Sequence, residues 1–374
     1  YVTVAGNPAS AIGPNLEGMR RRGYSAELIA CLRDAYRIVY RSGLKVEEAC
    51  ARLEPEAAGC PELAGFLASI RTARWGIVRP RAGVRGTLGP GDSARLLAGS
   101  TLRFADVRDP ASLVRDGLRG ERFDALVSCL ASRTGAPADA WAIDHRANLN
   151  ALDAARTAGA TQAVLLSAIC VQKPRLAFQH AKLAFEQALI GSGLDYSIVR
   201  PTAFFKSLSG QVDRVRRGKP FLVFGDGRLT ACKPIADEDL ADFLAGCLDD
   251  PARRNRVLPI GGPGPAITPR EQGEALFALI GRAPRFREVP LALLDAVIGT
   301  LGAAGRVLPR LAEKAELARI GRYYATESML VLDAASGRYD ADATPSTGTR
   351  TLFYHYARLV AGEAPPERGD HAVF

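Results

Sequence analysis

The sequence predicts an α/β protein, in which a Rossmann-like parallel sheet with a helical substrate lobe is preceded by a small all-α appendage. Two observations predict the sheet. Short, continuous apolar runs are typical of strands that are covered on both faces. Amphipathic helical stretches alternate with these runs, which indicates βα units. A third observation predicts the appendage, because the first eighty residues lack this alternation and contain mainly short helical patterns.

The appendage is expected to cover residues 1–79. Ser25 is placed to cap a helix that ends at Gly43, and shorter helices are expected at 46–53 and 61–70. No sheet is expected between residues 25 and 75. The sequence opens on a tyrosine rather than a methionine, so we expect it to begin inside a longer reading frame.

A Rossmann fold normally begins with a strand, a glycine-rich turn and a helix whose amino end holds the pyrophosphate. Residues 2–13 supply a strand and a first glycine. However, Ala9 replaces the middle glycine, the spacing is one residue too long, and Pro14 and Gly18 would interrupt the following helix. We therefore expect the first βα unit to be missing or replaced, which leaves open whether the cofactor still binds.

The α/β part is expected to span residues 80–374, with its candidate site between residues 164 and 208. An apolar strand at 163–167 places Ser167 at the carboxyl edge of the sheet, where open α/β sheets bind ligands. A helix then starts at Phe178 and carries Lys182 one turn later.

Further elements complete this part. A strand at 102–107 is expected to end in Asp106, and a strand at 125–129 contains Ser128. A helix is expected at 141–158. The next strand, at 196–200, is ended by Pro201 and followed by Thr202, Phe204, Phe205 and Lys206. Residues 203–360 are expected to form most of the substrate lobe, including a strand at 257–260 and a helix at 269–280.

The site segment resembles the divinyl (proto)chlorophyllide 8-vinyl reductases, which are atypical short-chain dehydrogenases. The resemblance runs from about Pro80 to Tyr356 and includes residues 128–135, 200–207 and 224–227. Short-chain dehydrogenases usually carry a tyrosine four residues before the lysine, whereas this chain has Phe178. Because phenylalanine has no proton to donate to a carbonyl oxygen, reduction of ordinary ketones is not expected.

The resemblance implies hydride transfer from NADPH to the 8-vinyl group of a chlorin, with Lys182 and Ser167 as the catalytic residues. The implied cofactor-binding residues are Arg79, Arg81, Asp106, Ser128, Ser167, Lys182, Pro201 and Thr202. The implied substrate-binding residues are Phe178, Phe204, Phe205 and Lys206, with Lys206 pairing with a propionate. The proton donor stays open between Lys182, Tyr196 and water, and the pigment between chlorophyllide and protochlorophyllide.

Structural roles are the alternatives for these residues. Ser167 could cap a strand, Lys182 could be a solvated helix lysine, and Phe204 with Phe205 could belong to the core. Asp106 could be a turn residue. Arg79 and Arg81 could lie in a solvated basic linker.

Residues 1–79 resemble the carboxyl-terminal domain of the acyl-carrier-protein–UDP-N-acetylglucosamine O-acyltransferase of lipid A synthesis. The resemblance implies a remnant of a sugar-nucleotide site at Asn15, Glu17, Arg21 and Arg22. That family's catalytic histidine has no counterpart here, so acyl transfer is not expected. The alternative to a working reductase is a fusion or fragment without reductase activity, in which the amino-terminal helices act only in binding or oligomer assembly.

Composition sets the outer limits. The formal charge is +9, but basic residues are interleaved with acidic ones and no nucleic-acid module is recognisable. Seven cysteines form no C-x-x-C pair, which suits a reducing cytoplasm, and four separated histidines predict no metal site. The apolar run at 289–309 is expected to be a buried or capping helix. Coverage of the macrocycle and peripheral membrane contact stay open for this run.

Overall fold

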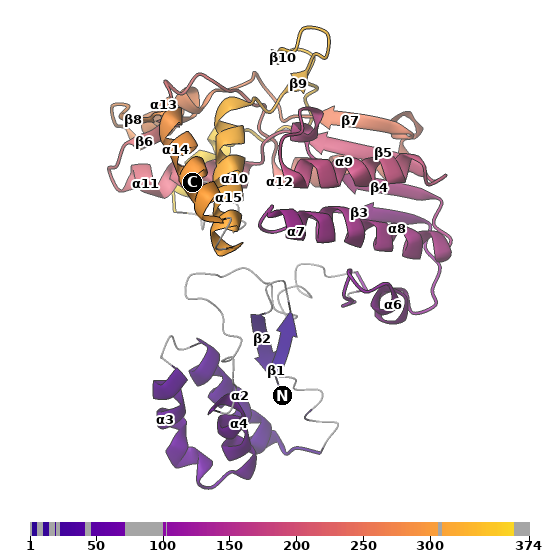
Figure 1. Cartoon of the computed structure of the whole chain (residues 1–374), viewed down its shortest axis with the longest axis vertical. Coiled ribbons are helices and arrows are strands. Elements are labelled where there is room, and N and C mark those ends of the chain that lie inside the picture. The colour runs from indigo at the N-terminus through magenta and orange to yellow at the C-terminus, as the bar shows by residue number, and fades with distance from the viewer. Residues whose placement is uncertain are drawn as a thin grey trace. The chain divides into compact units, whose positions relative to one another are not determined.

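The structure is a computed structural model that describes residues 2–5, 10–14, 19, 23–41, 46–71, 100–101, 103–305 and 309–362 (Figure 1). The chain divides into two compact units, Tyr1–Leu102 and Arg103–Phe374. The first unit contains the predicted appendage. The second contains the sheet and the lobe that carries most of the candidate site residues.

The first unit combines a β-hairpin with three helices. Strand β1 (Val2–Ala5) pairs antiparallel with β2 (Ser10–Pro14). Helices α2 (Ala26–Arg41), α3 (Val46–Ala57) and α4 (Pro61–Arg71) confirm the three predicted helices. The hairpin adds a small sheet that the all-α expectation did not include. Because the chain returns as a strand after β1, this segment is not the strand, turn and helix of a dinucleotide-binding unit.

The helices of the first unit enclose their own core. The hydroxyl of Ser25 accepts a hydrogen bond from the Leu28 amide at 3.2 Å, as expected for the cap of α2. The rings of Tyr36 and Tyr40 stack with their centroids 4.7 Å apart. The buried core includes Met19, Leu32, Tyr36, Val39, Leu53, Leu63 and Leu67. The unit therefore has an apolar interior independent of the sheet that follows.

The second unit is built on a parallel sheet in the order β3-β4-β5-β7. Its strands are β3 (Ala125–Ser128), β4 (Gln162–Leu166), β5 (Asp195–Pro201) and β7 (Arg256–Ile260). These strands confirm the predicted α/β class. Within the described residues, β4 is the strand that pairs with β3, so β3 lies at the edge of the sheet.

The prediction of a strand at 102–107 is wrong for the residues described. Residues 103–106 form neither helix nor strand, and a turn follows at 107–108. A parallel strand needs a neighbour that satisfies its backbone N–H and C=O groups, and no described strand offers that pairing here. Among the described residues no βα unit precedes this segment, so it has no neighbouring strand to pair with.

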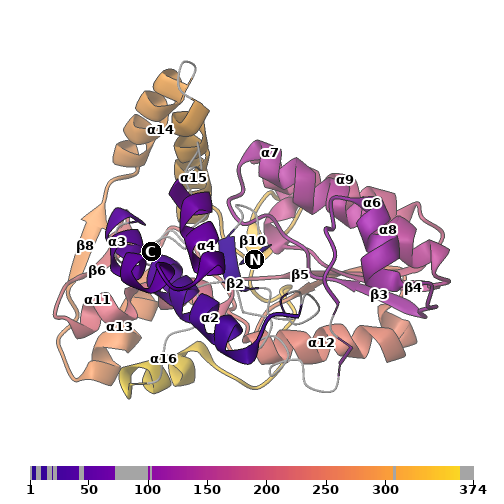
Figure 2. The ribbon, with the colours of Figure 1, turned by 90° about the horizontal axis from the view of Figure 1, so that it is seen from below.

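Helices cover both faces of the sheet. A continuous helical stretch runs through α7 (Pro137–Ala140), η2 (Trp141–Ala147) and α8 (Asn148–Thr157), which confirms the helix predicted at 141–158. Helix α9 (Ala177–Ile190) connects β4 to β5. Figure 2 shows α8 and α9 over one face of the strands, and α12 (Asp237–Asp249) over the other. The sheet is therefore buried from both sides, as continuous apolar strands require.

Shorter elements and the lobe complete the second unit. In chain order they are α6 (Pro110–Ser112), η1 (Leu113–Leu118), η3 (Ile169–Gln172), α10 (Phe205–Leu208), η4 (Ser209–Gln211), α11 (Val212–Arg216), β6 (Phe221–Phe224), η5 (Pro251–Arg253), α13 (Pro269–Ile280), β8 (Phe286–Val289), α14 (Leu291–Gly305), α15 (Pro309–Thr326), β9 (Val331–Leu332), β10 (Tyr339–Asp340) and α16 (Leu352–Val360). The strand predicted at 257–260 and the helix predicted at 269–280 are both present as β7 and α13.

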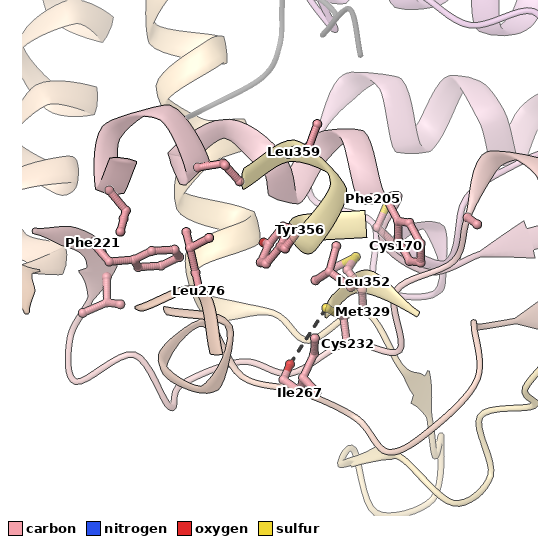
Figure 3. Close-up of a cluster of buried hydrophobic side chains, with 14 of the residues drawn as sticks. Cys170, Phe205, Phe221, Cys232, Ile267, Leu276, Met329, Leu352, Tyr356 and Leu359 are labelled. Carbon is pink, nitrogen blue, oxygen red and sulfur yellow. Dashed lines mark hydrogen bonds between the residues drawn. The ribbon is translucent and has the colours of Figure 1, made fainter. Parts of the chain in front are cut away.

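A large apolar core joins the lobe to the exit of β4 (Figure 3). Tyr356 of α16 lies at its centre, fully buried, and donates a hydrogen bond to the Leu208 carbonyl at 2.8 Å. Burial raises the pKa of the Cys232 thiol to about 12, so this residue stays protonated and packs as an apolar group. The core fixes the carboxyl-terminal helix against the strand ends that carry the site.

Helix α14 differs from expectation. The apolar run at 289–309 was expected to be buried or to cap the core, yet no residue of α14 is buried, and 56% of Leu293 is exposed. The helix packs against α15, and Arg322 of α15 forms an ion pair with Asp295 of α14. Among the helices described, none has the length and apolar character needed to cross a membrane.

Candidate active site

The predicted site residues meet at the carboxyl edge of the parallel sheet. Ser128 ends β3, Ser167 directly follows β4, and Thr202 directly follows β5. The register aligns Ser128 with Leu165 and Leu166 with Val199. Because parallel strands end at the same edge, these three hydroxyl groups lie along one rim of the sheet.

Lys182 is held in place by a buried acid. Its Nζ lies 2.9 Å from Oδ1 of Asp144, and the same oxygen accepts the Ser132 amide at 3.3 Å. Only 1% of the Asp144 side chain and 12% of the Lys182 side chain are exposed. The other oxygen, Asp144 Oδ2, is buried and has no hydrogen-bond partner among the described residues. This acceptor marks a position where a ligand hydroxyl or a water would be stabilised.

The sequence analysis missed Asp144, although a signal was present. Asp144 shares a buried helical stripe with Ala140, Ala147 and Asn148, which follow the spacing of one helix face. An acid on such a stripe requires a cation, because burial of an unpaired carboxylate is costly. The segment is π-helical, and π-helical turns often occur at functional sites.

Ser128 is tied to the same turn. Its hydroxyl donates to Oδ1 of Asn148 at 2.5 Å, and Nδ2 of Asn148 donates to the carbonyls of Ile143 and Asp144, both at 3.1 Å. The asparagine amide thus satisfies carbonyls that the widened π-turn leaves without their usual partners. The end of β3 and the Lys182–Asp144 pair form one connected network.

Ser167 belongs to a second buried network. Its hydroxyl donates to Oε1 of Glu186 at 2.5 Å, and Nε of Arg200 donates to that oxygen at 3.2 Å. Glu186 lies on α9 and is almost fully buried, and the Arg200 guanidinium also contacts its second oxygen. The Ser167 proton is therefore engaged, while its oxygen can still accept a hydrogen bond.

Pro201 and Thr202 form the rim beyond β5. Pro201 pairs in register with Ile260 of β7, and the Thr202 amide donates to the Ile260 carbonyl at 2.9 Å. The Thr202 hydroxyl donates to the carbonyl of Lys233. Both residues are buried, and their role toward a cofactor stays a prediction.

The four predicted substrate residues lie in different surroundings. Phe178 packs against the edge of the large core. Phe205 is buried inside that core, as Figure 3 shows, with its ring 5.5 Å from the His355 ring. Phe204 is half-buried, and Nζ of Lys206 lies 5.8 Å from its ring centroid. Lys206 also lies 3.9 Å from Asp237 and is 42% exposed. The core position of Phe205 separates it from the other three.

Asp106 lies in an exposed loop. It accepts hydrogen bonds from the side chain and the amide of Arg108, and these bonds lower the pKa of the Asp106 carboxyl. Its predicted adenine contact remains a prediction. Arg79, Arg81, Asn15, Glu17, Arg21 and Arg22 lie outside the described residues.

A third network was also missed by the sequence analysis. Glu327 follows α15, is buried, and contacts Lys173 at 2.7 Å, Arg175 at 2.9 Å and the Tyr339 hydroxyl at 2.8 Å. Desolvation alone would raise the pKa of Glu327, but the bonds from Lys173 and Tyr339 and the two cations lower it overall. No cluster of three metal-ligating side chains occurs in the part of the chain described.

Comparisons with known proteins match two successive parts of the chain. Residues 1–78 match the family model described as Udp N-acetylglucosamine O-acyltransferase, Domain 2, and residues 79–251 match the model described as NAD(P)H-binding. An acyl-[acyl-carrier-protein]–UDP-N-acetylglucosamine O-acyltransferase from Ectopseudomonas mendocina is 58% identical over 79 residues, which are 21% of this chain and 31% of the relative. The chain therefore spans about a third of that acyltransferase.

Other relatives match far more of the chain. A chloroplastic divinyl chlorophyllide a 8-vinyl-reductase from Zea mays is 51% identical over 304 residues, covering 80% of this chain and 76% of the relative. The structure of an NADPH-dependent quinone oxidoreductase from Escherichia coli, complexed with NADPH, aligns with a TM-score of 0.50 at 19% identity. It covers 73% of this chain and 88% of that chain, which supports the Rossmann-like fold. The chain belongs to the divinyl chlorophyllide a 8-vinyl-reductase family.

Proposed function

We propose that this chain reduces the 8-vinyl group of a divinyl chlorophyllide or protochlorophyllide to an ethyl group, with NADPH as the reductant. The carrying observation is 51% identity over 304 residues to a protein named for that reaction. The phenylalanine at position 178 also supports it. Reduction of a carbon–carbon double bond forms no oxyanion at a carbonyl, so the usual phenol is not required.

The residues of the sheet edge fit the nicotinamide end of the cofactor. Asp144 Oδ2 offers a buried acceptor beside the fixed Lys182 ammonium, and this pair would hold the ribose hydroxyls. Ser128, Ser167 and Thr202 would line the nicotinamide. When bound, the reduced nicotinamide supplies a hydride to one carbon of the vinyl group. Preference for NADPH would rest on Arg79 and Arg81, whose guanidinium groups suit a 2′-phosphate.

The substrate side combines apolar surface with one cation. Phe178 and Phe204 would face the macrocycle, Phe205 would support them from the core, and Lys206 would pair with a propionate. The exposed Leu293 and Val297 of α14 suit peripheral contact with a membrane surface, where an apolar pigment concentrates. All seven cysteines are free thiols, which is consistent with work in a reducing compartment such as the cytoplasm.

The test uses the whole purified chain with divinyl chlorophyllide a and NADPH. We expect a shift of the pigment's absorption spectrum and a monovinyl product on chromatography, at the expense of NADPH. An unchanged pigment, under conditions in which the maize relative converts it, would overturn the proposal.

NADPH binding, followed separately by fluorescence, locates the cause of a failure. No saturable signal would favour the inactive-fusion alternative, because a sheet without its first βα unit lacks the usual pyrophosphate contacts.

A second proposal concerns the first unit, which we infer to be a binding or assembly module. Its 58% identity to the acyltransferase relative over 79 residues and its separate apolar core support this role. Residual UDP-sugar binding would use Asn15, Glu17, Arg21 and Arg22. Calorimetric titration with UDP-N-acetylglucosamine tests the binding role, and the absence of heat would remove it. Sedimentation of the whole chain tests assembly, which a strictly monomeric chain would exclude.

A further inference from the structure

The proposed reduction requires a proton donor, and neither Phe178 nor Tyr196 is suited to this role. Hydride addition fills one vinyl carbon, and the other carbon must take a proton. Phe178 has none to give. Tyr196 was one candidate, but it is the second residue of β5, five positions before Pro201 at the carboxyl edge. At about 3.3 Å per residue, that places it roughly 16 Å from the rim.

We propose that the hydroxyl of Tyr324 is the proton donor of the vinyl reduction, in the place of the phenol that is missing at position 178. This assignment rests on the proposed function. Tyr324 lies near the end of α15, far in sequence from the α9 position where the family of short-chain dehydrogenases carries its tyrosine.

The contacts of Tyr324 bring its hydroxyl to the exit of β4. The oxygen lies 3.9 Å from Sγ of Cys170, which is three residues beyond Ser167. The Cys170 carbonyl accepts a hydrogen bond from Nε2 of Gln179 at 3.1 Å, and Gln179 follows Phe178 directly on α9. The phenol and Phe178 therefore border the same short segment.

A second contact confirms that α15 reaches Phe178. A Cβ placed on Gly135 would lie 2.7 Å from Cδ1 of Ile320 and 3.9 Å from Cδ1 of Phe178. Ile320 and Phe178 thus flank the same glycine. Ile320 precedes Tyr324 by four residues, so the two side chains share one face of α15.

The neighbouring Tyr323 has a structural role, and its exposure and hydrogen bonds differ from those of Tyr324. Only 4% of Tyr323 is exposed, and its hydroxyl donates to the carbonyls of Cys170 and Lys173 at 2.9 and 3.0 Å. By contrast, 39% of Tyr324 is exposed, and the hydrogen-bond contact described for its hydroxyl is a thiol, which is a weak partner. The proton of Tyr323 is committed to the backbone, whereas that of Tyr324 is available.

The surroundings of Tyr324 keep its hydroxyl protonated by raising its pKa. Although part of the ring reaches solvent, its surroundings are dense, and desolvation together with Cys170 and Tyr323 raises the pKa of Tyr324 well above 10. Desolvation also raises the pKa of Cys170, while the nearby Lys182 ammonium acts in the opposite direction. Both groups are therefore protonated at neutral pH, and the Lys182 ammonium acts on the thiol that the Tyr324 hydroxyl contacts.

The proton and electron balance is complete. The hydride forms a C–H bond at one vinyl carbon, and the π electron pair moves to the other carbon. That carbon forms its C–H bond with the Tyr324 proton as the O–H bond breaks, and the bonding electrons stay on the phenolate oxygen. The nicotinamide is oxidised by two electrons, the vinyl group is reduced to ethyl, and solvent returns a proton to Tyr324.

The test compares Tyr324→Phe with the wild-type chain and with Tyr354→Phe, an exposed tyrosine on α16. We expect Tyr324→Phe to lower kcat by about 10²-fold or more, as for loss of a general acid. NADPH binding by fluorescence and the KM for pigment should stay within about twofold, because the variant removes no binding contact of the cofactor. The solvent isotope effect on kcat should rise, since protonation becomes slower than hydride transfer.

Two further outcomes separate the hypotheses. If the wild-type chain leaves the pigment unchanged, the proposed function fails, and this assignment fails with it. If the wild-type chain converts the pigment, and Tyr324→Phe does so as fast and with the same solvent isotope effect, only the Tyr324 assignment is overturned. Should Tyr324→Phe fail to fold, 3-fluorotyrosine at position 324 retains the shape with a more acidic hydroxyl. The alkaline limb of the pH–kcat profile should then move to lower pH, and an unmoved limb would overturn the assignment.

Discussion

Two lysines at the rim of the sheet, Lys182 and Lys206, have very different surroundings. Lys182 is 12% exposed and lies 2.9 Å from a carboxylate that is itself 1% exposed. Lys206 is 42% exposed and lies 3.9 Å from the half-exposed Asp237. The first pair is part of the buried interior, and the second is a long, exposed surface contact. Lys182 is therefore held in one orientation by its buried partner, whereas Lys206 is only weakly attracted to Asp237.

Breaking the buried Lys182–Asp144 pair should lower the free energy of unfolding more than any other change considered below. Lys182→Met leaves the Asp144 carboxylate buried without its cation, so the free energy of unfolding should fall by about 3–5 kcal/mol. Urea denaturation measures this change, and fluorescence should show that NADPH binding is lost. The double variant Lys182→Met with Asp144→Leu should recover most of the stability but not the binding. Equal stability of Lys182→Met and the wild type would show that the pair is not a buried constraint.

The Glu186 network extends the comparison to a second buried acid. Glu186→Gln removes the charge that faces Arg200 and weakens the hydrogen bond from Ser167. The free energy of unfolding should therefore fall by about 2–3 kcal/mol. Ser167→Ala removes a single hydrogen bond and should cost about 1 kcal/mol. Thermal or urea unfolding ranks the two variants. A larger cost for Ser167→Ala than for Glu186→Gln would contradict the central position of the glutamate.

Glu327 is intermediate, because the acid is buried while its two cations are partly exposed. Glu327→Gln should lower the free energy of unfolding by about 1–2 kcal/mol at neutral pH, after allowance for solvent screening. The pKa of Glu327 is lower in the folded chain than the 4.5 of an unperturbed glutamate. Its stabilisation is thus complete above that value and is lost as the pH falls through the folded pKa. Unfolding measured from pH 7 to pH 3 should show the wild type and the variant converging below about pH 4.5. A constant difference would contradict this.

Lys206 should give the smallest change in stability. Lys206→Ala should alter the free energy of unfolding by less than about 0.5 kcal/mol, because the pair with Asp237 is long and exposed. If Lys206 pairs with a propionate, KM for the free-acid pigment should rise about fivefold, the equivalent of about 1 kcal/mol. The methyl ester serves as the control, and its KM should not change. Equal effects on acid and ester would remove the propionate contact.

Sequence patterns predicted the regular elements well, because strands and helices here follow local periodicity. The strands around Val164 and Ile198 and the helix that starts beside Phe178 lie where the apolar spacing placed them. The strand predicted at 102–107 failed for a non-local reason. Its pairing partner would come from a first βα unit, which the described residues do not contain, and local composition does not show whether a partner strand is present.

The site was predicted in part for the same reason. Ser167 and Lys182 follow from strand ends and helix spacing, but their partners Glu186 and Asp144 arise from packing between elements. Asp144 was detectable as an acid on a buried stripe. The proposed role of Tyr324 could not be predicted from local spacing, because Ile320 of α15 and Phe178 of α9 come together only in the tertiary structure, beside Gly135. Similarly, exposure of α14 could not be read from an apolar run, since such a run usually indicates burial.

The asparagine inside the π-turn has a mechanical consequence. Asn148 accepts a hydrogen bond from Ser128, the last residue of β3, and donates one to the carbonyl of Asp144. The Asp144 carboxylate in turn forms the ion pair with Lys182 of α9. The end of β3, the turn and the Lys182 ammonium group are therefore joined by one continuous set of polar contacts. A disturbance at the rim of β3 would be transmitted to the place where the nicotinamide sugar is proposed to rest.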